Sequence, residues 1–168
     1  MNTTNNLGYL MQHVAAVMAR QADQVLQDKL NIGLSQFKIL MILQKHPGVQ
    51  QRFIADGLGQ TEASVTRQIK LLHEVKLVTS KPDPTDRRQH IATPTILGKK
   101  TATDAMKLIR DTFGPEYESM GRECFQQLID GLNALHGVVC QEGKTSNCGH
   151  VMDTASADTI PAALRSRA

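Results

Sequence analysis

Apolar positions recur at intervals of three and four residues along the segment 7–30. Leu7, Met11, Val14 and Met18 follow this spacing, and the segment holds no proline and a single early glycine. The pattern predicts an amphipathic helix of about six turns. A terminal helix of this length needs a partner surface to cover its apolar face.

A second helix is predicted around the apolar run at residues 39–43. Ser35 is a favourable N-cap residue before the run, and Pro47-Gly48 stops the helix after it. Because consecutive apolar residues cover almost every side of a helix, we expect this helix to be buried nearly all round.

Two further helices follow, with a short interruption between them. Residues 50–57 predict the first, and residues 58–60, with their central glycine, interrupt it. Thr61 can cap the second helix, which runs to about Val75. Two helices joined by a turn of three or four residues that contains glycine form a helix-turn-helix.

Beyond residue 77 the composition changes to that of strands and turns. Residues 78–81 and 89–93 predict two short strands, and the loop between them holds two prolines and two aspartates within residues 82–86. A small β-hairpin therefore follows the helix-turn-helix directly.

Two more helical patterns complete the folded part of the chain. The first follows Thr95 and carries apolar residues as far as Phe113, after which Gly114-Pro115 predicts a break or a kink. The last carries apolar residues at intervals of three and four: Phe125, Leu128, Leu132, Leu135 and Val139. Small and polar residues dominate after residue 141, and they predict a mostly mobile tail.

The charge is concentrated in the middle of the chain. The net charge is +3, and residues 61–100 hold eight lysines and arginines against four acidic residues. This excess favours an anionic partner bound at one place, although a solvated charged surface explains it equally well. No segment reaches eighteen consecutive apolar residues, and the first eight residues lack the layout of a signal peptide. We therefore expect a cytoplasmic protein without a membrane partner.

The helix predicted after Thr61 has two contrasting faces. At 100° per residue, one face is apolar and the other carries small, hydroxyl and cationic side chains, namely Ala63, Ser64, Thr66, Arg67 and Lys70. Such a face can enter the major groove of DNA, where Arg67 can bind guanine, Ser64 or Thr66 can reach a base or a phosphate, and Lys70 can reach a phosphate. An ordinary amphipathic surface helix would show the same pattern.

The hairpin carries Asp86, Arg87 and Arg88 at its tip. An arginine there can enter the narrow minor groove, where the negative potential is deepest, and Asp86 can hold its guanidinium group in an extended position. The alternative is a solvated ion pair within the loop. The basic helix and the basic hairpin together favour binding to double-stranded DNA.

Several motifs resemble the multiple-antibiotic-resistance regulator (MarR) family: residues 61–67, Leu77-Val78, residues 83–88 and residues 95–98. The resemblance runs from about residue 7 to 141, and residues 83–88 are its most specific part. It implies a homodimer built from the first and the last two helices, with a winged helix-turn-helix in each protomer. It also implies a regulator that binds pseudo-palindromic operators, usually as a repressor, and that a small, often aromatic ligand or an oxidant releases.

The predicted fold class is therefore mainly α with a small β-hairpin wing, a winged helix-turn-helix plus a helical dimerisation region. The predicted parts are an N-terminal dimerisation helix (1–32), a DNA-binding lobe (33–98), helices that complete the dimerisation region (99–142) and a flexible tail (143–168).

Two residues depart from the family pattern. Lys76 stands where a glycine is common, so a non-glycine residue must adopt positive φ or the turn must be rebuilt. Pro94 lacks a backbone N–H and should shorten the second strand of the wing.

The family implies a ligand pocket between the dimer helices and the DNA-binding lobe, and His13, Phe37 and Met41 are candidates to line it. The alternative is that they are core and interface residues. No cysteine precedes Cys124, which disfavours the peroxide-sensing branch of the family. We expect Cys124 to be a small buried apolar residue.

A redox- or metal-responsive regulator remains an alternative, with the loosely spaced Cys140, Cys148 and His150 as candidate groups and His136 as a further ligand one helical turn before Cys140. An interaction module without DNA binding is another, but the retained basic residues speak against it. An enzyme would have to use Cys140 and His136, and neither an oxyanion motif nor a phosphate loop accompanies them. We predict no catalytic residue, metal or cofactor.

Overall fold

The computed structural model describes residues 3–84 and 90–139. Within them the order of elements is α1 (Thr3–Leu30), α2 (Leu34–Lys45), β1 (Val49–Gln50), α3 (Gln51–Leu58), α4 (Glu62–Glu74), β2 (Val78–Pro82), β3 (His90–Pro94), α5 (Ile96–Ser119) and α6 (Arg122–Val139). A mainly helical chain with a small antiparallel sheet confirms the predicted fold class.

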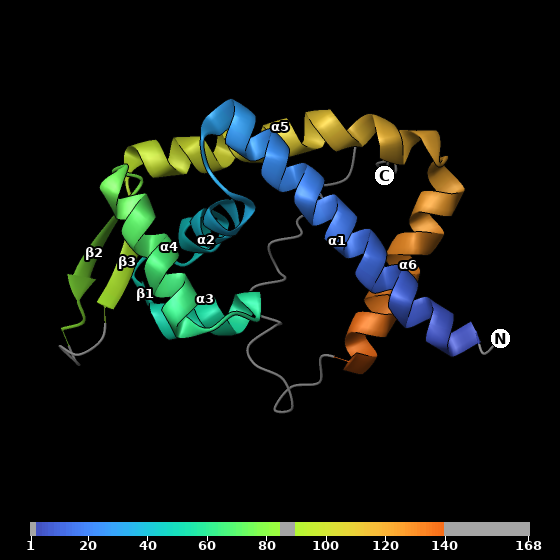
Figure 1. Ribbon diagram of the computed structural model, residues 1–168, viewed down its shortest axis with the longest axis horizontal. Helices are drawn as coiled ribbons and strands as arrows, with labels where there is room; N and C mark the ends of the chain where they lie inside the picture. The colour runs from blue at the N-terminus through green and yellow to red at the C-terminus, as the bar shows by residue number, and fades with distance from the viewer. Residues whose placement is uncertain (1–2, 85–89, 140–168) are drawn as a thin grey trace, which may run out of the picture.

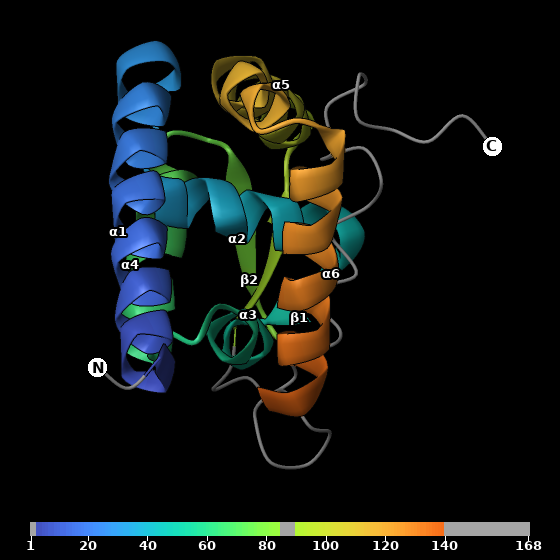
Figure 2. The same cartoon turned by 90° about the vertical axis from the view of Figure 1, so that its right-hand side faces the viewer.

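The elements form a lobe with two long helical arms (Figure 1). Helices α2, α3 and α4 and the sheet gather at one end, and α5 runs from this lobe to α6 at the other end. Helix α1 crosses from the lobe towards α6, but Figure 2 shows α1 and α6 on opposite sides of the molecule. The C-terminal half of α1 packs on α2 and α5 through Ala22 and Leu26, whereas its N-terminal half lies away from the core.

Helix α2 is the centre of the core. Ile39, Leu40, Ile42 and Leu43 are almost fully buried, as the apolar run in the sequence predicts. The surrounding elements add further buried side chains, including Leu26, Ile54, Val65, Leu72, Val78 and Ala102. Burial of each large aliphatic side chain contributes about 1.5–3 kcal/mol, so this cluster orients the surrounding helices.

The N-terminus of α2 differs from the prediction. Gly33, not Ser35, is the N-cap residue. The side chain of Gln36 accepts the N–H of Gly33 at 3.0 Å, and Asp23 from α1 accepts the N–H of Leu34 at 2.7 Å. With these donors already satisfied by other side chains, the hydroxyl of Ser35 pairs instead with the amide of Gln60.

The cap of α4 and the turn after it agree with the sequence. The hydroxyl of Thr61 accepts the N–H of Ser64 at 3.2 Å. Lys76 adopts a φ of 60°, the left-handed conformation expected where the family has glycine. The adjacent N–H of Leu77 donates to the carbonyl of Leu72 at 2.8 Å, which closes the C-terminus of the helix.

The sheet has a strand that the sequence pattern does not predict. The order is β1-β3-β2, and the two residues of β1 pair with Ala92 and Ile91 of β3. A two-residue strand is too short for any alternation of apolar and polar positions to show.

The expectation that Pro94 shortens the wing is wrong. Strand β3 reaches Pro94, which lies opposite Val78, and β2 and β3 are equally long. Proline is tolerated because it is the last residue of the strand and β1 reaches only Ala92. The next N–H, from Thr95, donates to the carbonyl of Leu77 at 3.0 Å and continues the ladder.

Of the break or kink expected at Gly114-Pro115, the break does not occur, because α5 continues to Ser119. Proline removes one helical hydrogen bond, but Phe113 and Gly114 are buried and packing holds the segment in place. The chain turns instead at Gly121, whose φ is 79°. Beyond it, Phe125 of α6 packs against Tyr117 of α5, with ring centroids 5.8 Å apart.

The first turn of α5 lies against the turn that follows α4. The hydroxyl of Thr95 caps α5 by accepting the N–H of Gly98 at 3.0 Å, and it donates to the carbonyl of Lys76 at 2.8 Å. A Cβ atom at Gly98 would overlap the carbonyl oxygen of Leu77. Only glycine therefore permits this approach of the two backbones.

We predict that Gly98→Ala lowers the free energy of unfolding by about 2–3 kcal/mol, because backbone rather than a flexible side chain must move. Gly131→Ala is the control, since nothing surrounds that exposed helical glycine, and it should raise stability by about 0.5–1 kcal/mol. Urea unfolding followed by circular dichroism measures both values. Equal stability of the two variants would contradict the close approach.

Candidate nucleic-acid interface

Helix α4 presents a mixed polar and cationic face to solvent. Thr66, Arg67 and Lys70 are exposed together with Ala63, whereas Val65, Ile69 and Leu72 on the opposite side are buried. Ser64 is half-buried, and its backbone N–H is held by Thr61. Neither Arg67 nor Lys70 forms an ion pair with any residue that the structure describes. Their charges are therefore available to an anionic partner.

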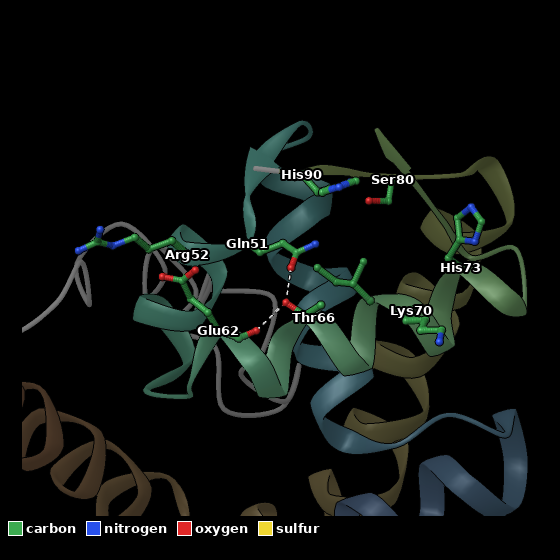
Figure 3. A pocket seen from close by; sticks show the side chains of 9 residues that line it. Gln51, Arg52, Glu62, Thr66, Lys70, His73, Ser80 and His90 are labelled. Atoms are coloured by element: carbon green, nitrogen blue, oxygen red, sulfur yellow. Dashed lines mark hydrogen bonds between the residues drawn. The ribbon is translucent and has the colours of Figure 1, made fainter. Parts of the chain in front are cut away.

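Thr66 is less free than its exposure suggests. Its hydroxyl lies within hydrogen-bonding distance of the side-chain oxygen of Gln51 and of the carbonyl of Glu62 (Figure 3). A hydroxyl carries one hydrogen, so the two acceptors share it. The contact joins the first residue of α3 to the middle of α4 and fixes the angle within the helix-turn-helix.

A hollow of about 540 Å³ lies beside this face, between α3, α4 and the two strands β2 and β3. Its lining carries the basic groups Arg52 and Lys70, the imidazoles of His73 and His90, and a single acidic group, Glu62. Arg52 lies 3.9 Å from Asp56 in an exposed pair that contributes little to stability. Figure 3 shows His90 and Ser80 across the hollow from α4. The charged groups of the lining are thus mainly cationic, which suits an anion.

The tip of the wing, with Asp86, Arg87 and Arg88, lies outside the described residues. What the structure shows is the stem of the hairpin, from Val78 to Pro82 and from His90 to Pro94. The stem follows the C-terminus of α4 directly along the chain, in the order that the sequence predicts.

Asp83, at the end of the stem, is a residue whose importance sequence reasoning missed. It is the one charged side chain buried among the described residues, with 7% of its surface exposed. The amide of Gln50 donates to its carboxylate at 2.9 Å, which ties the wing to the start of α3. The sequence motif marks Asp83 only as a turn residue, because its partner lies 33 positions away.

We predict that Asp83→Ala lowers the free energy of unfolding by about 1–3 kcal/mol, because the amide of Gln50 loses its buried acceptor. Asp83→Asn should retain part of this stability, since its amide oxygen can still accept that hydrogen bond. Asp104→Ala, at an exposed position of α5, serves as the control and should change stability by no more than about 0.5 kcal/mol. Urea unfolding gives all three values. A loss no larger at position 83 than at 104 would show that the buried contact is unimportant.

The candidate ligand residues occupy different environments. Phe37 is buried in the core, Met41 packs against the core, and His13 is exposed on α1, where it stacks on Tyr9 with ring centroids 6.0 Å apart. None of the three lines the hollow beside α4. That they line a pocket between protomers stays a prediction.

The expectation that Cys124 is buried is wrong. It lies exposed in the first turn of α6, because Phe125 takes the position that faces α5. Cys140, Cys148 and His150 fall outside the described residues. Within the described ranges no three histidine, cysteine or acidic side chains gather as metal ligands do.

The sequence comparison identifies the lobe that holds this interface. Residues 30–89 match the model of the MarR family. Over these residues the chain is similar to the MarR family. The match confirms the resemblance inferred from the motifs, and it covers the helix-turn-helix and the first strand of the wing. No curated protein matches the sequence closely.

Solved structures show that the likeness extends beyond the MarR domain. The regulator BldR from Sulfolobus solfataricus superposes with a TM-score of 0.71 at 20% identity, covering 83% of this chain and 100% of BldR. A mutant of MarR from E. coli complexed with operator DNA gives 0.69 at 21% identity, covering 80% of this chain and 96% of MarR. CouR from Rhodococcus jostii RHA1, bound to p-coumaroyl-CoA, gives 0.65 at 21% identity, covering 80% and 92%.

These likenesses establish the fold of the whole described chain as that of MarR-family transcriptional regulators, helical arms included. None of the described helices is both long enough and apolar enough to cross a membrane.

Proposed function

We propose that this protein is a homodimeric transcription regulator that binds double-stranded DNA in a sequence-specific manner. The observation that carries the proposal is the exposed cationic face of α4, placed beside the stem of a wing in a MarR fold. One protein of this fold has been solved on operator DNA. In this proposal α4 enters the major groove and the wing, with Arg87, Arg88 and the supporting Asp86, enters the adjacent minor groove.

The roles of the side chains on α4 follow from their positions. Arg67 has no ion partner within the described chain and can fork onto the O6 and N7 atoms of guanine. Lys70 lies at the rim of the hollow and is suited to a phosphate. The hydroxyl of Thr66 is held by its hydrogen bonds to Gln51 and Glu62, and it can still accept a hydrogen bond from a base. The side chain of Ser64 can add a short contact to a base or a phosphate.

The proposal of a homodimer rests on two apolar stripes. On α1, Leu7, Met11, Val14 and Met18 are exposed at intervals of three and four residues. On α6, Leu128, Leu132 and Val139 continue the same spacing from Phe125, and they too are exposed. A second copy of the chain would cover both stripes, since each is apolar along a whole helix face and would otherwise lie in water.

Different parts of the chain would then form the dimer and bind DNA. Residues 1–32 and 99–142 would build the dimer, and residues 33–98 would form the DNA-binding lobe. A pseudo-palindromic operator follows, because a two-fold protein presents two equal lobes to the duplex.

The regulatory outcome that we propose is repression relieved by a small, aromatic ligand. Support comes from CouR, a protein of the same fold solved with p-coumaroyl-CoA. The ligand site would lie between the dimer arms and the lobe, with His13, Phe37 and Met41 as its candidate residues.

We predict that Arg67→Ala relaxes base preference at one position of each half-site, at a cost of about 1–3 kcal/mol per half-site. Selection of duplexes from a random pool by the wild-type protein and the variant measures the preference. Lys70→Ala is the matched control, because loss of a phosphate contact weakens binding to all sequences alike. A variant at position 67 that selects the wild-type consensus would refute base readout by this residue.

We predict that Leu132→Glu converts the dimer to a monomer, because a carboxylate would be buried in the apolar interface. Sedimentation velocity gives the mass, and Leu97→Glu, at another exposed leucine, should leave the dimer intact.

Footprints of the wild-type protein on DNA should show two half-sites about one helical turn apart, about 10 base pairs. A wild-type protein that sediments as a monomer and binds a single half-site would end the proposal.

A further inference from the structure

The hollow beside α4 lies on a different side of the helix from Arg67. At 100° per residue, His73 is turned about 120° away from Arg67 and points towards the sheet. Ser80 and His90 reach the hollow from the face of the sheet that carries the buried Val78 and Ala92, since alternate residues of a strand share a face. Arg67, the residue proposed to bind guanine, therefore does not line the hollow, whereas Thr66 and Lys70 do.

The hollow lies where one strand of a bound duplex would pass. The major and minor grooves are separated by one sugar-phosphate strand on each side. A protein that places a helix in the major groove and a wing in the neighbouring minor groove must let that strand pass between them. The space between α4 and the stem of the wing is this hollow.

The charges around the hollow suit such a strand. Arg52 from α3 and Lys70 from α4 are cationic, and Glu62, at the start of α4, is the one acidic group of the lining. Outside the lining, Glu74 follows His73 on α4, Asp56 faces Arg52, and Lys81 lies on the other face of the sheet.

Asp83, at the end of the stem, is buried and bound by Gln50. No carboxylate in the described chain lies within ion-pair distance of His73 or His90. Both imidazoles are exposed and can accept a proton when an anion arrives.

We propose that the hollow binds the sugar-phosphate backbone of the DNA duplex, and that His73 and His90 donate hydrogen bonds to phosphate oxygens as imidazolium groups. This proposal rests on the DNA-binding function proposed above. The hydroxyl of Ser80 adds a neutral contact, and Lys70 adds a cationic group.

A measurable consequence is uptake of protons on binding. A phosphate beside an imidazole favours its charged form, so the bound protein holds more protons than the free protein near neutral pH. Affinity must then rise as pH falls through this range, by about tenfold per pH unit for each proton taken up. Each phosphate that a charged imidazole neutralises also steepens the dependence of log K on log salt by about 0.9.

The experiment measures binding of the selected duplex by the full chain at about pH 6 and about pH 8, each over a series of salt concentrations. Three proteins are compared: the wild type, the double variant His73→Gln with His90→Gln, and Lys70→Gln. Circular dichroism and sedimentation at both pH values establish that each variant is folded and has the mass of the wild type.

For the wild type we expect affinity at least about tenfold higher at the lower pH, with a steeper salt dependence. The double variant should lose most of this pH dependence and bind like the wild type at the higher pH, because glutamine takes up no proton on binding. Lys70→Gln should bind more weakly at both pH values yet keep the full pH dependence, because both imidazoles remain in this variant.

Two results would overturn the inference: a wild-type affinity that does not change with pH, or a double variant that keeps the wild-type pH dependence. In both cases specific DNA binding itself would still be observed, so the proposed function would stand. A wild-type protein that binds no duplex at either pH would instead remove the proposed function, and this inference with it.

Discussion

The arrangement of this protein depends on one close contact between two backbones, where the first turn of α5 lies on the turn that ends α4. The carbonyl of Leu77 accepts the N–H of Thr95, the hydroxyl of Thr95 bonds the carbonyl of Lys76, and Gly98 leaves room for the carbonyl oxygen. The end of the exposed helix, both ends of the wing stem and the start of the long arm meet at this point. Any change in the contact therefore changes the angle between the lobe and the arm, which a dimer would use to space its two lobes.

The two ends of the molecule expose different kinds of side chain, so they suit different kinds of partner. The lobe exposes cations and imidazoles over a hydrogen-bonded polar surface, whereas the arms expose apolar side chains at helical spacing. Binding a polyanion lowers the free energy of exposed cations, whereas burying them in an apolar interface raises it. Apolar stripes are stabilised only when water is removed from them. In the proposed function, one surface would therefore bind DNA and the other a second copy of the chain, without competition between them.

Much of the fold follows from local signals. The long amphipathic α1, the buried α2, the cap at Thr61 and the positive φ at Lys76 all agree with expectations from the sequence. The failures have a common cause, because each depends on packing or on a partner outside the local pattern. Asp23 from α1 and the side chain of Gln36 satisfy the start of α2, which moves the cap from Ser35 to Gly33. Phe113 is buried, so the helix carries on through Pro115, and Phe125 takes the inward position that leaves Cys124 in solvent.

For the candidate interface, the sequence alone determined which residues α4 exposes, because a helix turns by a constant angle and the apolar face must be buried. It could not place Gln51 against Thr66, Gln50 against Asp83, or His90 across a hollow from His73. Those pairs bring together α3, α4 and the sheet, and their separation in the chain leaves no periodic trace. Periodicity predicts which face of a single helix or strand is buried. A hollow between elements forms only when packing of the core brings those elements side by side.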